Sequence, residues 1–188
     1  EAAAMGSLRR ERQVVFQGPF GSIEPRMTAG QAVGEALRAL AGPVASVAAQ
    51  DRIRAALSDV GLASAFANRY PHEMSGGQCQ RVAIARAIVA RPRLLVCDEA
   101  VSALDVSVQA QIVNLLHELS ERYQMSLLFI SHNLAVVRHL CDDVAVLCQG
   151  RLVEQGSRDA IFDDPQAQYT RDLLAAVPRL PGAPVRNY

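Results

Sequence analysis

The sequence contains no lysine: all nineteen of its basic residues are arginine, and they balance nineteen acidic residues. The formal net charge of zero gives no global field that would attract nucleic acid or an anionic membrane surface. Without lysine, the 188 residues contain no Gly-x-x-x-x-Gly-Lys segment of the kind that cradles phosphate groups. No apolar run approaches the roughly 18 to 20 residues needed to cross a bilayer. The composition therefore argues against a nucleic-acid-binding role and against a membrane-embedded chain.

Cysteine is scarce as well, and its placement is informative. The four cysteines show no paired spacing typical of metal ligands, and three of them fall in apolar patterns, which predicts reduced, structural thiols; they are Cys79, Cys97, Cys141 and Cys148. Half of the residues are apolar, and 20.3 kDa suffices for one substantial domain, or for a domain with a small appendage. The sequence predicts a globular protein that is cytosolic or peripheral to a membrane.

One stretch, from Met74 to Asp105, combines a glycine turn, a helix, a buried strand and an acidic pair. Ser75, Gly76 and Gly77 lack bulk and open a helix that is expected to begin near Gln78. Free backbone N–H groups and the positive end of the helix dipole then face outward together. This turn is therefore predicted to bind an anion.

The buried strand of this stretch ends in two carboxylates. The apolar run Leu94–Cys97 is typical of a parallel strand, and Asp98 and Glu99 follow it directly. Open α/β sheets bind ligands at the carboxyl ends of their strands, where such a pair can hold a hydrated Mg²⁺ and orient or deprotonate a water molecule. Taken alone, the pair fits a solvated strand end equally well.

A second strand has a similar ending. Ser126–Ile130 reads as a buried strand and leads into Ser131, His132 and Asn133. Consecutive parallel strands joined by a right-handed helical crossover usually lie close together in the sheet. We therefore expect His132 to lie on the same sheet edge as Glu99.

Three motifs in this order carry a resemblance to a known family. Met74-Ser75-Gly76-Gly77-Gln78, Asp98-Glu99 and Ser102-Ala103-Leu104-Asp105 together resemble the ATP-binding subunits of ABC transporters. The resemblance implies that Ser75, Gly76, Gly77 and Gln78 are the signature motif, which touches the γ-phosphate of ATP held by the opposite subunit. It also implies that Asp105 closes the D-loop, which crosses the dimer interface.

The same resemblance implies four further roles. Asp98 would support Mg²⁺ at the end of the Walker B strand, and Glu99 would polarise the attacking water. Gln17 would be the Q-loop glutamine, which helps to ligate Mg²⁺, and His132 the switch histidine, which bonds the γ-phosphate. His72, His117 and His139 are interpreted as structural or surface residues.

Two segments outside these motifs narrow the resemblance. Val15–Thr28 and Asp164–Pro178 are similar to the corresponding parts of importers of dipeptides, oligopeptides and nickel. The chain departs from the family pattern in four places: Gly18 stands for aspartate, Cys79 for arginine, and Ala100 and Val101 for Pro-Thr.

The predicted fold class is α/β: a partial P-loop NTPase, or RecA-like, parallel sheet with an α-helical subdomain and a C-terminal helical extension. Thr28, Ser107 and Ser157 are expected to cap helices, and Val177 to lie on the last one. The regions are 1–12 without assigned structure, 13–27 the end of a core strand and the Q-loop, 28–73 the helical subdomain, 74–156 the catalytic core, and 157–188 the helical extension with a proline-rich tail.

The resemblance implies an ATP-hydrolysing subunit of a peptide-type ABC importer that uses ATP and Mg²⁺. Its partners would be a second ATPase subunit, transmembrane permease subunits and, indirectly, a substrate-binding protein, with no nucleic acid. The location would be cytoplasmic, on the inner face of the cell membrane. Because no phosphate-binding loop is present, we expect the chain to be a fragment. Two alternatives stay open: a non-catalytic module that lends its signature motif and D-loop to a partner, and a soluble ABC ATPase without membrane subunits.

Overall fold

The computed structural model describes residues 8–18, 21, 23–42 and 45–176. Two compact units are present, residues 1–132 and residues 133–188. The boundary follows His132, inside the range 74–156 that the sequence analysis treats as one region. Residues 8–11 are helical and Arg12 begins the first strand, whereas the sequence pattern assigns no structure to 1–12.

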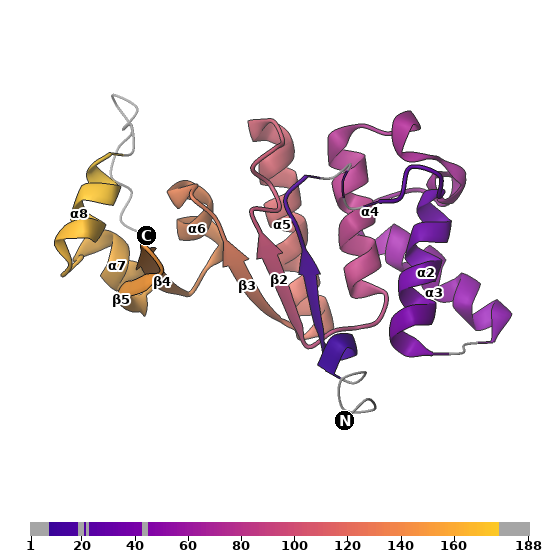
Figure 1. Ribbon diagram of the computed structural model, residues 1–188, viewed down its shortest axis with the longest axis horizontal. Coiled ribbons are helices and arrows are strands. Elements are labelled where there is room, and N and C mark those ends of the chain that lie inside the picture. Colours follow the sequence, from indigo (N-terminus) through magenta and orange to yellow (C-terminus); the bar gives the residue numbers. More distant parts are fainter. Residues whose placement is uncertain (1–7, 19–20, 22, 43–44, 177–188) are drawn as a thin grey trace. The chain divides into compact units, whose positions relative to one another are not determined.

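Among its described residues, the first unit contains a three-stranded parallel sheet, and α4 (Gly76–Ile88), α2 (Ala29–Ala41) and α3 (Ser46–Asp59) lie beyond the edge that its first strand forms (Figure 1). Its strands lie in the order β1 (Arg12–Val15), β2 (Leu94–Asp98) and β3 (Ser126–Ile130). The register pairs β1 with β2 at Val15 and Cys97, and β2 with β3 at Cys97 and Phe129. The predicted parallel strands and their adjacency are confirmed.

The two faces of this sheet differ in burial. Val15, Leu95 and Cys97 are almost completely buried on one face, and α4 (Gly76–Ile88) packs against β1. On the other face, Val14 and Leu128 are 42% and 51% exposed although both are apolar. Parallel sheets are normally covered on both faces. Among the described residues, however, only one face of this sheet is buried.

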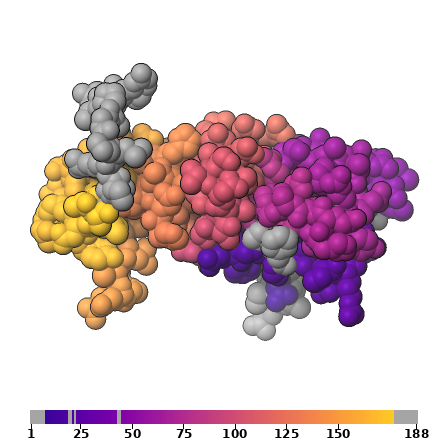
Figure 2. Space-filling view, turned by 90° about the horizontal axis from the view of Figure 1, so that it is seen from above, coloured from indigo at the N-terminus to yellow at the C-terminus, as the bar shows by residue number. Residues whose placement is uncertain are grey.

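Helices and 3₁₀ turns occupy the described part of the segment 28–73, which the sequence pattern assigns to a helical subdomain. It contains α2 (Ala29–Ala41), α3 (Ser46–Asp59) and the short 3₁₀ turns η1 (Ser64–Asn68) and η2 (Pro71–Glu73). The Thr28 hydroxyl accepts from the Gln31 N–H while the Gln31 amide oxygen accepts from the Thr28 N–H, which is a capping box. Figure 2 shows these residues, coloured purple to magenta, as one continuous part of the surface.

No single helix among the described residues has the length and apolar composition needed to cross a membrane. The helices α2 and α3 reach that length and composition only when taken together, and they are bent at 117° to each other.

The helix that connects β2 with β3 is α5 (Val106–Tyr123), and its cap differs from the prediction. Asp105, not Ser107, caps it: the Asp105 carboxylate accepts from the Val108 N–H at 3.0 Å. The Ser107 hydroxyl donates to the same carboxylate at 2.7 Å. A carboxylate is favoured over a hydroxyl here because it accepts both donors and complements the helix dipole. Likewise, α4 begins at Gly76 rather than near Gln78.

A polar cluster links the helical subdomain to α5. Asp59, the last residue of α3, accepts from Arg122 Nη1 at 2.8 Å and from the Tyr123 hydroxyl. Helix spacing would favour Glu118, four positions before Arg122, as a partner, but Arg122 binds Asp59 instead. A carboxylate is unfavourable at a helix C-terminus, and the arginine and the hydroxyl offset this effect.

Tyr123→Phe is expected to lower the free energy of unfolding by about 1 kcal/mol at pH 9, because the bond to Asp59 is lost. Burial and that hydrogen bond raise the pKa of Tyr123 from 10.0 to about 12. A raised folded-state pKa means that the Tyr123 contribution is complete below pH 10 and is lost as the pH rises through 12. Urea titrations should therefore show the difference between wild type and variant shrinking over this range.

The buried Cys97 thiol also has a pKa raised to about 12, but it is present in both proteins and cancels in the difference. A difference between wild type and Tyr123→Phe that stays constant up to pH 12 would contradict the linkage of Tyr123 ionisation to folding.

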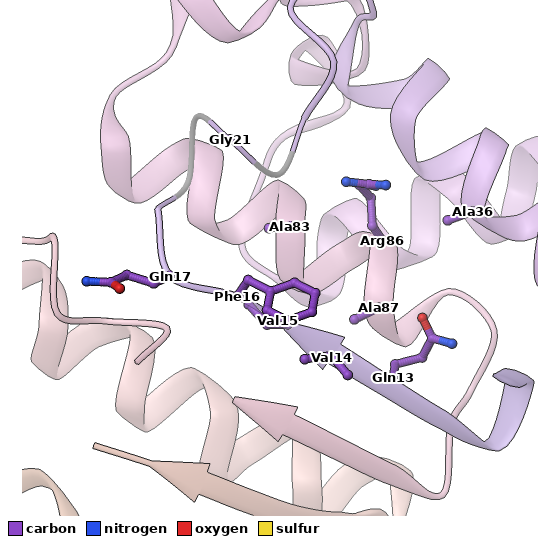
Figure 3. A pocket seen from close by; sticks show the side chains of 10 residues that line it. All are labelled: Gln13, Val14, Val15, Phe16, Gln17, Gly21, Ala36, Ala83, Arg86 and Ala87. Atoms are coloured by element: carbon purple, nitrogen blue, oxygen red, sulfur yellow. The ribbon is translucent and has the colours of Figure 1, made fainter. Parts of the chain in front are cut away.

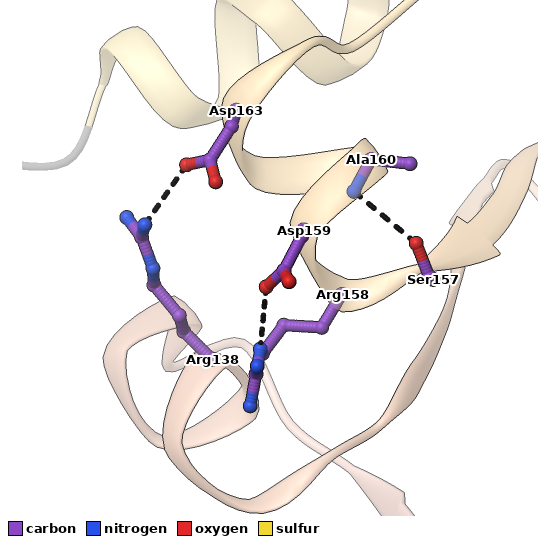
Figure 4. Close-up of polar contacts among 6 residues, drawn as sticks. All are labelled: Arg138, Ser157, Arg158, Asp159, Ala160 and Asp163. Carbon is purple, nitrogen blue, oxygen red and sulfur yellow. Dashed lines mark hydrogen bonds and ion pairs between the residues drawn. The ribbon is translucent and has the colours of Figure 1, made fainter. Parts of the chain in front are cut away.

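The second unit contains a hairpin and three short helices: α6 (Leu134–Leu140), β4 (Asp143–Cys148), β5 (Arg151–Ser157), α7 (Arg158–Asp163) and α8 (Gln168–Ala175). The strands β4 and β5 pair antiparallel. Figure 4 shows how the polar contacts hold α7: Arg138 of α6 binds Asp163 at 2.8 Å, and the Ser157 hydroxyl accepts from the Ala160 N–H, which confirms the predicted cap.

The start of α8 is attached to β5 by one carboxylate. Glu154 accepts from the N–H groups of Gln166 and Ala167 at 2.7 and 3.2 Å. The nearby Thr170 side chain and these backbone N–H groups lower the pKa of Glu154, which favours its charged form. The expected last residue of the helical stripe, Val177, and the prolines Pro178, Pro181 and Pro184 lie outside the described residues.

Candidate functional site

Glu99 occupies an unusual turn at the carboxyl end of β2. Its φ is +46°, a left-handed conformation that non-glycine residues adopt only at a cost of about 1–3 kcal/mol. Its N–H donates to the carbonyl of Ile130 at 3.0 Å, which ties the turn to the end of β3. Asp98 precedes it as the last, half-buried residue of β2. The turn therefore fixes where the Glu99 carboxylate projects.

His132 lies beside Glu99, as the strand order predicts. Its Nδ1 is 2.9 Å from Glu99 Oε1. The His132 side chain is 72% exposed and that of Glu99 is 32% exposed, so both remain accessible to a ligand. This contact brings together two groups that are 33 residues apart in the chain.

The residues after Glu99 explain how the turn is held without the Pro-Thr of the family pattern. Ala100 and Val101 are buried, with 3% and 2% of their surfaces exposed. The hydroxyl and N–H of Ser102 both donate to the Glu99 carbonyl, at 3.0 and 3.1 Å. The two substituted residues thus pack into the interior, and Ser102 closes the turn.

Gly76 and Gly77, expected to precede the helix, form the first turn of α4 after the N-cap Ser75. The Ser75 hydroxyl accepts from the Gln78 N–H at 3.3 Å, and the Gln78 amide oxygen accepts from the Ser75 N–H at 2.9 Å. This capping box fixes the first turn, which begins with Gly76 and Gly77. Helix starts of this kind are favourable sites for anions.

The side chains that follow this turn are more buried than the sequence pattern predicts. Cys79 is fully buried with its Sγ 3.7 Å from the Pro71 carbonyl, and burial raises the pKa of its thiol. The thiol therefore belongs to the interior rather than to a polar contact at the turn. Gln80, expected to be solvated, is fully buried, and its amide has no hydrogen-bonding partner among the described residues. A buried unsatisfied amide costs about 1–3 kcal/mol.

Asp105 combines a structural role with a position at the start of α5. The Val108 N–H and the Ser107 hydroxyl, both donating to its carboxylate, lower its pKa. The carboxylate is therefore held charged at the helix start, where the dipole also favours it.

Gln17 follows β1 at the same carboxyl edge of the sheet as Glu99, since Val15 pairs with Cys97. It borders a pocket of about 430 Å³ that β1 forms with α2 and α4. Figure 3 shows Gln17 at one end of this pocket and Gln13 at the other, with Arg86 of α4 on the side of Ala36. The pocket lies where the segment after β1 meets the helical subdomain.

The structure therefore groups the candidate residues into two sets. Gln17, Asp98, Glu99 and His132 follow the carboxyl ends of the three parallel strands. Ser75, Gly76, Gly77 and Gln78 begin α4, and Asp105 caps α5. Among the described residues, no group of three or more His, Cys, Asp or Glu side chains forms a metal cage.

The structure draws attention to residues to which the sequence pattern assigns no functional role: Asp59, Gln80, Val108, Arg122 and Tyr123. Asp59 binds Arg122 and Tyr123 across 63 and 64 residues, and Val108 lies against Gly77; no local pattern identifies these contacts.

A family model described as ABC transporter matches residues 2–102. With the strand-end residues, the glycine turn and the parallel sheet in place, the chain belongs to the ABC transporter family. Membership of this family implies ATP binding.

Similar curated proteins are also ATP-binding proteins of transport systems. The oligopeptide transport ATP-binding protein OppF of Escherichia coli (strain K12) is 48% identical over 172 residues, which are 92% of this chain and 52% of that protein. A putative peptide import ATP-binding protein of Brucella abortus (strain 2308) is 50% identical over 95% of this chain and 53% of its own length. The chain thus spans about half the length of these curated relatives.

Solved structures match the fold. CbiO1 from Clostridium perfringens, described as part of the ABC transporter complex CbiONQ, aligns with a TM-score of 0.77 and 26% identity, over 87% of this chain and 64% of that one. The ATP-binding cassette MJ0796, a dimer bound to ADP and Pi, aligns with a TM-score of 0.70 and 28% identity, over 84% and 68%. The α/β fold class predicted from the sequence is confirmed.

Proposed function

We propose that these residues form part of the ATP-hydrolysing subunit of an ABC importer for peptides. The observation that carries the proposal is the 2.9 Å contact of His132 with Glu99, beside Asp98, at the carboxyl ends of two adjacent strands. Relatives named for oligopeptide and peptide import support peptides as the transported class.

The strand-end set supplies groups suited to hydrolysis. Glu99 would orient and deprotonate the attacking water, and His132 would hold Glu99 and bond the γ-phosphate. The Glu99 backbone would be held in place for this role, because its N–H is bonded to Ile130 and its carbonyl to Ser102. Holding reacting groups at fixed distance supplies much of the acceleration that an enzyme achieves.

Asp98 and Gln17 would hold Mg²⁺. Carboxylate and amide oxygens are the donors that Mg²⁺ prefers, and it usually takes one or two carboxylates together with phosphate oxygens and water. The two side chains that follow β2 and β1 fit this requirement. When bound, the ion neutralises the negative charge of the phosphate groups.

The helix-start set would act on the nucleotide of a second ATPase subunit. Ser75, Gly76, Gly77 and Gln78 offer backbone N–H groups at the start of α4 to a γ-phosphate. Asp105 would lie at the contact between subunits. Two subunits closing on ATP would then drive permease subunits in the cell membrane, with this protein on its cytoplasmic face.

The test uses the polypeptide that contains these residues, purified from its own cells together with its partner subunits. We call it the native polypeptide. We expect Mg²⁺-dependent ATP turnover by this complex, and loss of labelled di- and oligopeptide uptake in cells without it. A complex that neither binds nor hydrolyses ATP would contradict the catalytic role. ATP turnover without any change in peptide uptake would contradict the substrate class.

A second candidate function is a non-catalytic module that lends Ser75–Gln78 and Asp105 to a competent partner. The placement of Ser75–Gln78 at the start of α4 and of Asp105 at the start of α5 favours it. Mixing the chain with a relative that contains such a segment tests it. An increase in the relative's ATP turnover supports the module, and an unchanged rate counts against it.

A further inference from the structure

The start of α4 and the start of α5 lie in direct contact at Gly77 and Val108. A Cβ atom placed on Gly77 would lie 2.6 Å from Cγ1 of Val108 and 3.8 Å from its Cβ. Carbon atoms pack at about 3.5–4.0 Å, so a side chain at position 77 would collide with this valine. Gly77 lies inside the first turn of α4, where helical backbone readily accepts alanine. The valine, rather than the backbone, therefore requires glycine at position 77.

Val108 is itself held in place by the cap of α5. Its N–H donates to the Asp105 carboxylate at 3.0 Å, and the Ser107 hydroxyl reinforces that carboxylate at 2.7 Å. Val108 lies only three positions after Asp105, so the capping bond fixes the valine relative to the aspartate. A rigid connection thus runs from Asp105 through Val108 to Gly77.

The contact continues one turn further along both helices. Arg81, four residues after Gly77, donates from Nη2 to Gln111 Oε1 at 3.4 Å, and Gln111 lies three residues after Val108. Residues with these spacings share one face of a helix. The same faces of α4 and α5 therefore meet over two successive turns, which shows that the approach at Gly77 is part of a defined helix contact.

We propose that Val108 is a positioning residue that sets the spacing between the glycine turn Ser75–Gln78 and Asp105. This inference rests on the proposed function, in which both elements act on the nucleotide of the second subunit. They can engage it together only if their spacing within one chain is fixed beforehand. Val108 fixes the spacing between the two elements because its Cγ1 methyl group packs against Gly77, where any other residue would have its side chain.

The contact is tested first by the unfolding of the 188-residue chain. Gly77→Ala is expected to shift the unfolding equilibrium about 5- to 150-fold toward the unfolded state, because it overpacks the contact. In a Val108→Ala background the same change should be neutral or stabilising, since the colliding methyl group is gone and alanine favours the helix. Equal destabilisation in both backgrounds would overturn the inference.

Positioning is tested in the native polypeptide with its partner subunits, through ATP turnover and ATP-dependent subunit association. Val108→Ala is expected to lower kcat at least about 10-fold with a smaller change in KM, and to weaken the association. Val108→Thr keeps the branched shape at a half-buried site and should retain both properties. A threonine variant as impaired as the alanine variant would overturn the inference.

Val113→Ala is the matched control, because it makes the same truncation in the same helix at a residue that is 3% exposed. Val113→Ala should lower the free energy of unfolding while leaving kcat near the wild-type value. If Val108→Ala and Val113→Ala lose kcat equally, Val108 has only a structural role. Wild-type complex without ATP turnover would reject the proposed function and the positioning role with it. The unfolding cycle would still decide whether Val108 requires glycine at position 77.

Discussion

Glu99→Gln is expected to lower ATP turnover by the native polypeptide about 10²- to 10⁴-fold while ATP still binds. Glutamine has nearly the same shape and keeps a polar contact with His132, but it cannot accept a proton from the attacking water. The backbone bonds that hold the turn, from the Glu99 N–H to Ile130 and from Ser102 to the Glu99 carbonyl, are unchanged. The loss should therefore appear in kcat, with little effect on nucleotide affinity.

Steady-state ATPase measurements and equilibrium binding of labelled ATP test this prediction together. Glu118→Gln provides a control with the same loss of charge, because Glu118 is exposed on the surface of α5. Turnover close to normal in Glu99→Gln would remove Glu99 from the role of general base. Loss of ATP binding in the same variant would instead assign Glu99 to nucleotide affinity.

His132→Ala should lower turnover about 10²-fold or more, because the contact with Glu99 and the proposed bond to the γ-phosphate are lost together. The side chain is 72% exposed, so the free energy of unfolding should change by no more than about 0.5 kcal/mol. A large kinetic effect without a stability effect would be specific to a role at the phosphate.

Combining the two changes makes the prediction more specific. Groups that act as a unit lose activity non-additively, so Glu99→Gln and His132→Ala together should cost less than the product of their separate effects. His117→Ala, at an exposed position on α5, serves as the control and should leave turnover unchanged. Fully multiplicative losses would mean that the 2.9 Å contact has no catalytic consequence.

The arrangement at the strand ends could be predicted because it depends on simple rules. Apolar runs ending in Asp98-Glu99 and in Ser131-His132 indicate buried strands, and a right-handed crossover places consecutive parallel strands side by side. The observed register, with Cys97 beside Phe129, brings the two ends together as expected. The capping residues Thr28 and Ser157 were predictable for a similar reason, since capping depends on neighbours in the sequence.

Other features depended on groups that no local pattern connects. Asp59 binds Arg122 and Tyr123 across 63 and 64 residues, whereas helix spacing favours a local partner for Arg122. Gln80 has the polarity of a surface residue and yet lies fully buried. Such placements follow from how helices pack, which depends on the shapes of many side chains at once.

By itself, the sequence determined which segments form helices and strands, at which ends of the strands the candidate site residues lie, and to which family the chain belongs. Only the tertiary structure decided that Glu99 adopts a left-handed turn bonded to Ile130 and that Gly77 makes room for Val108. The physical reason is range: periodicity and capping act within a few residues, whereas close approach between helices is known only once they are packed.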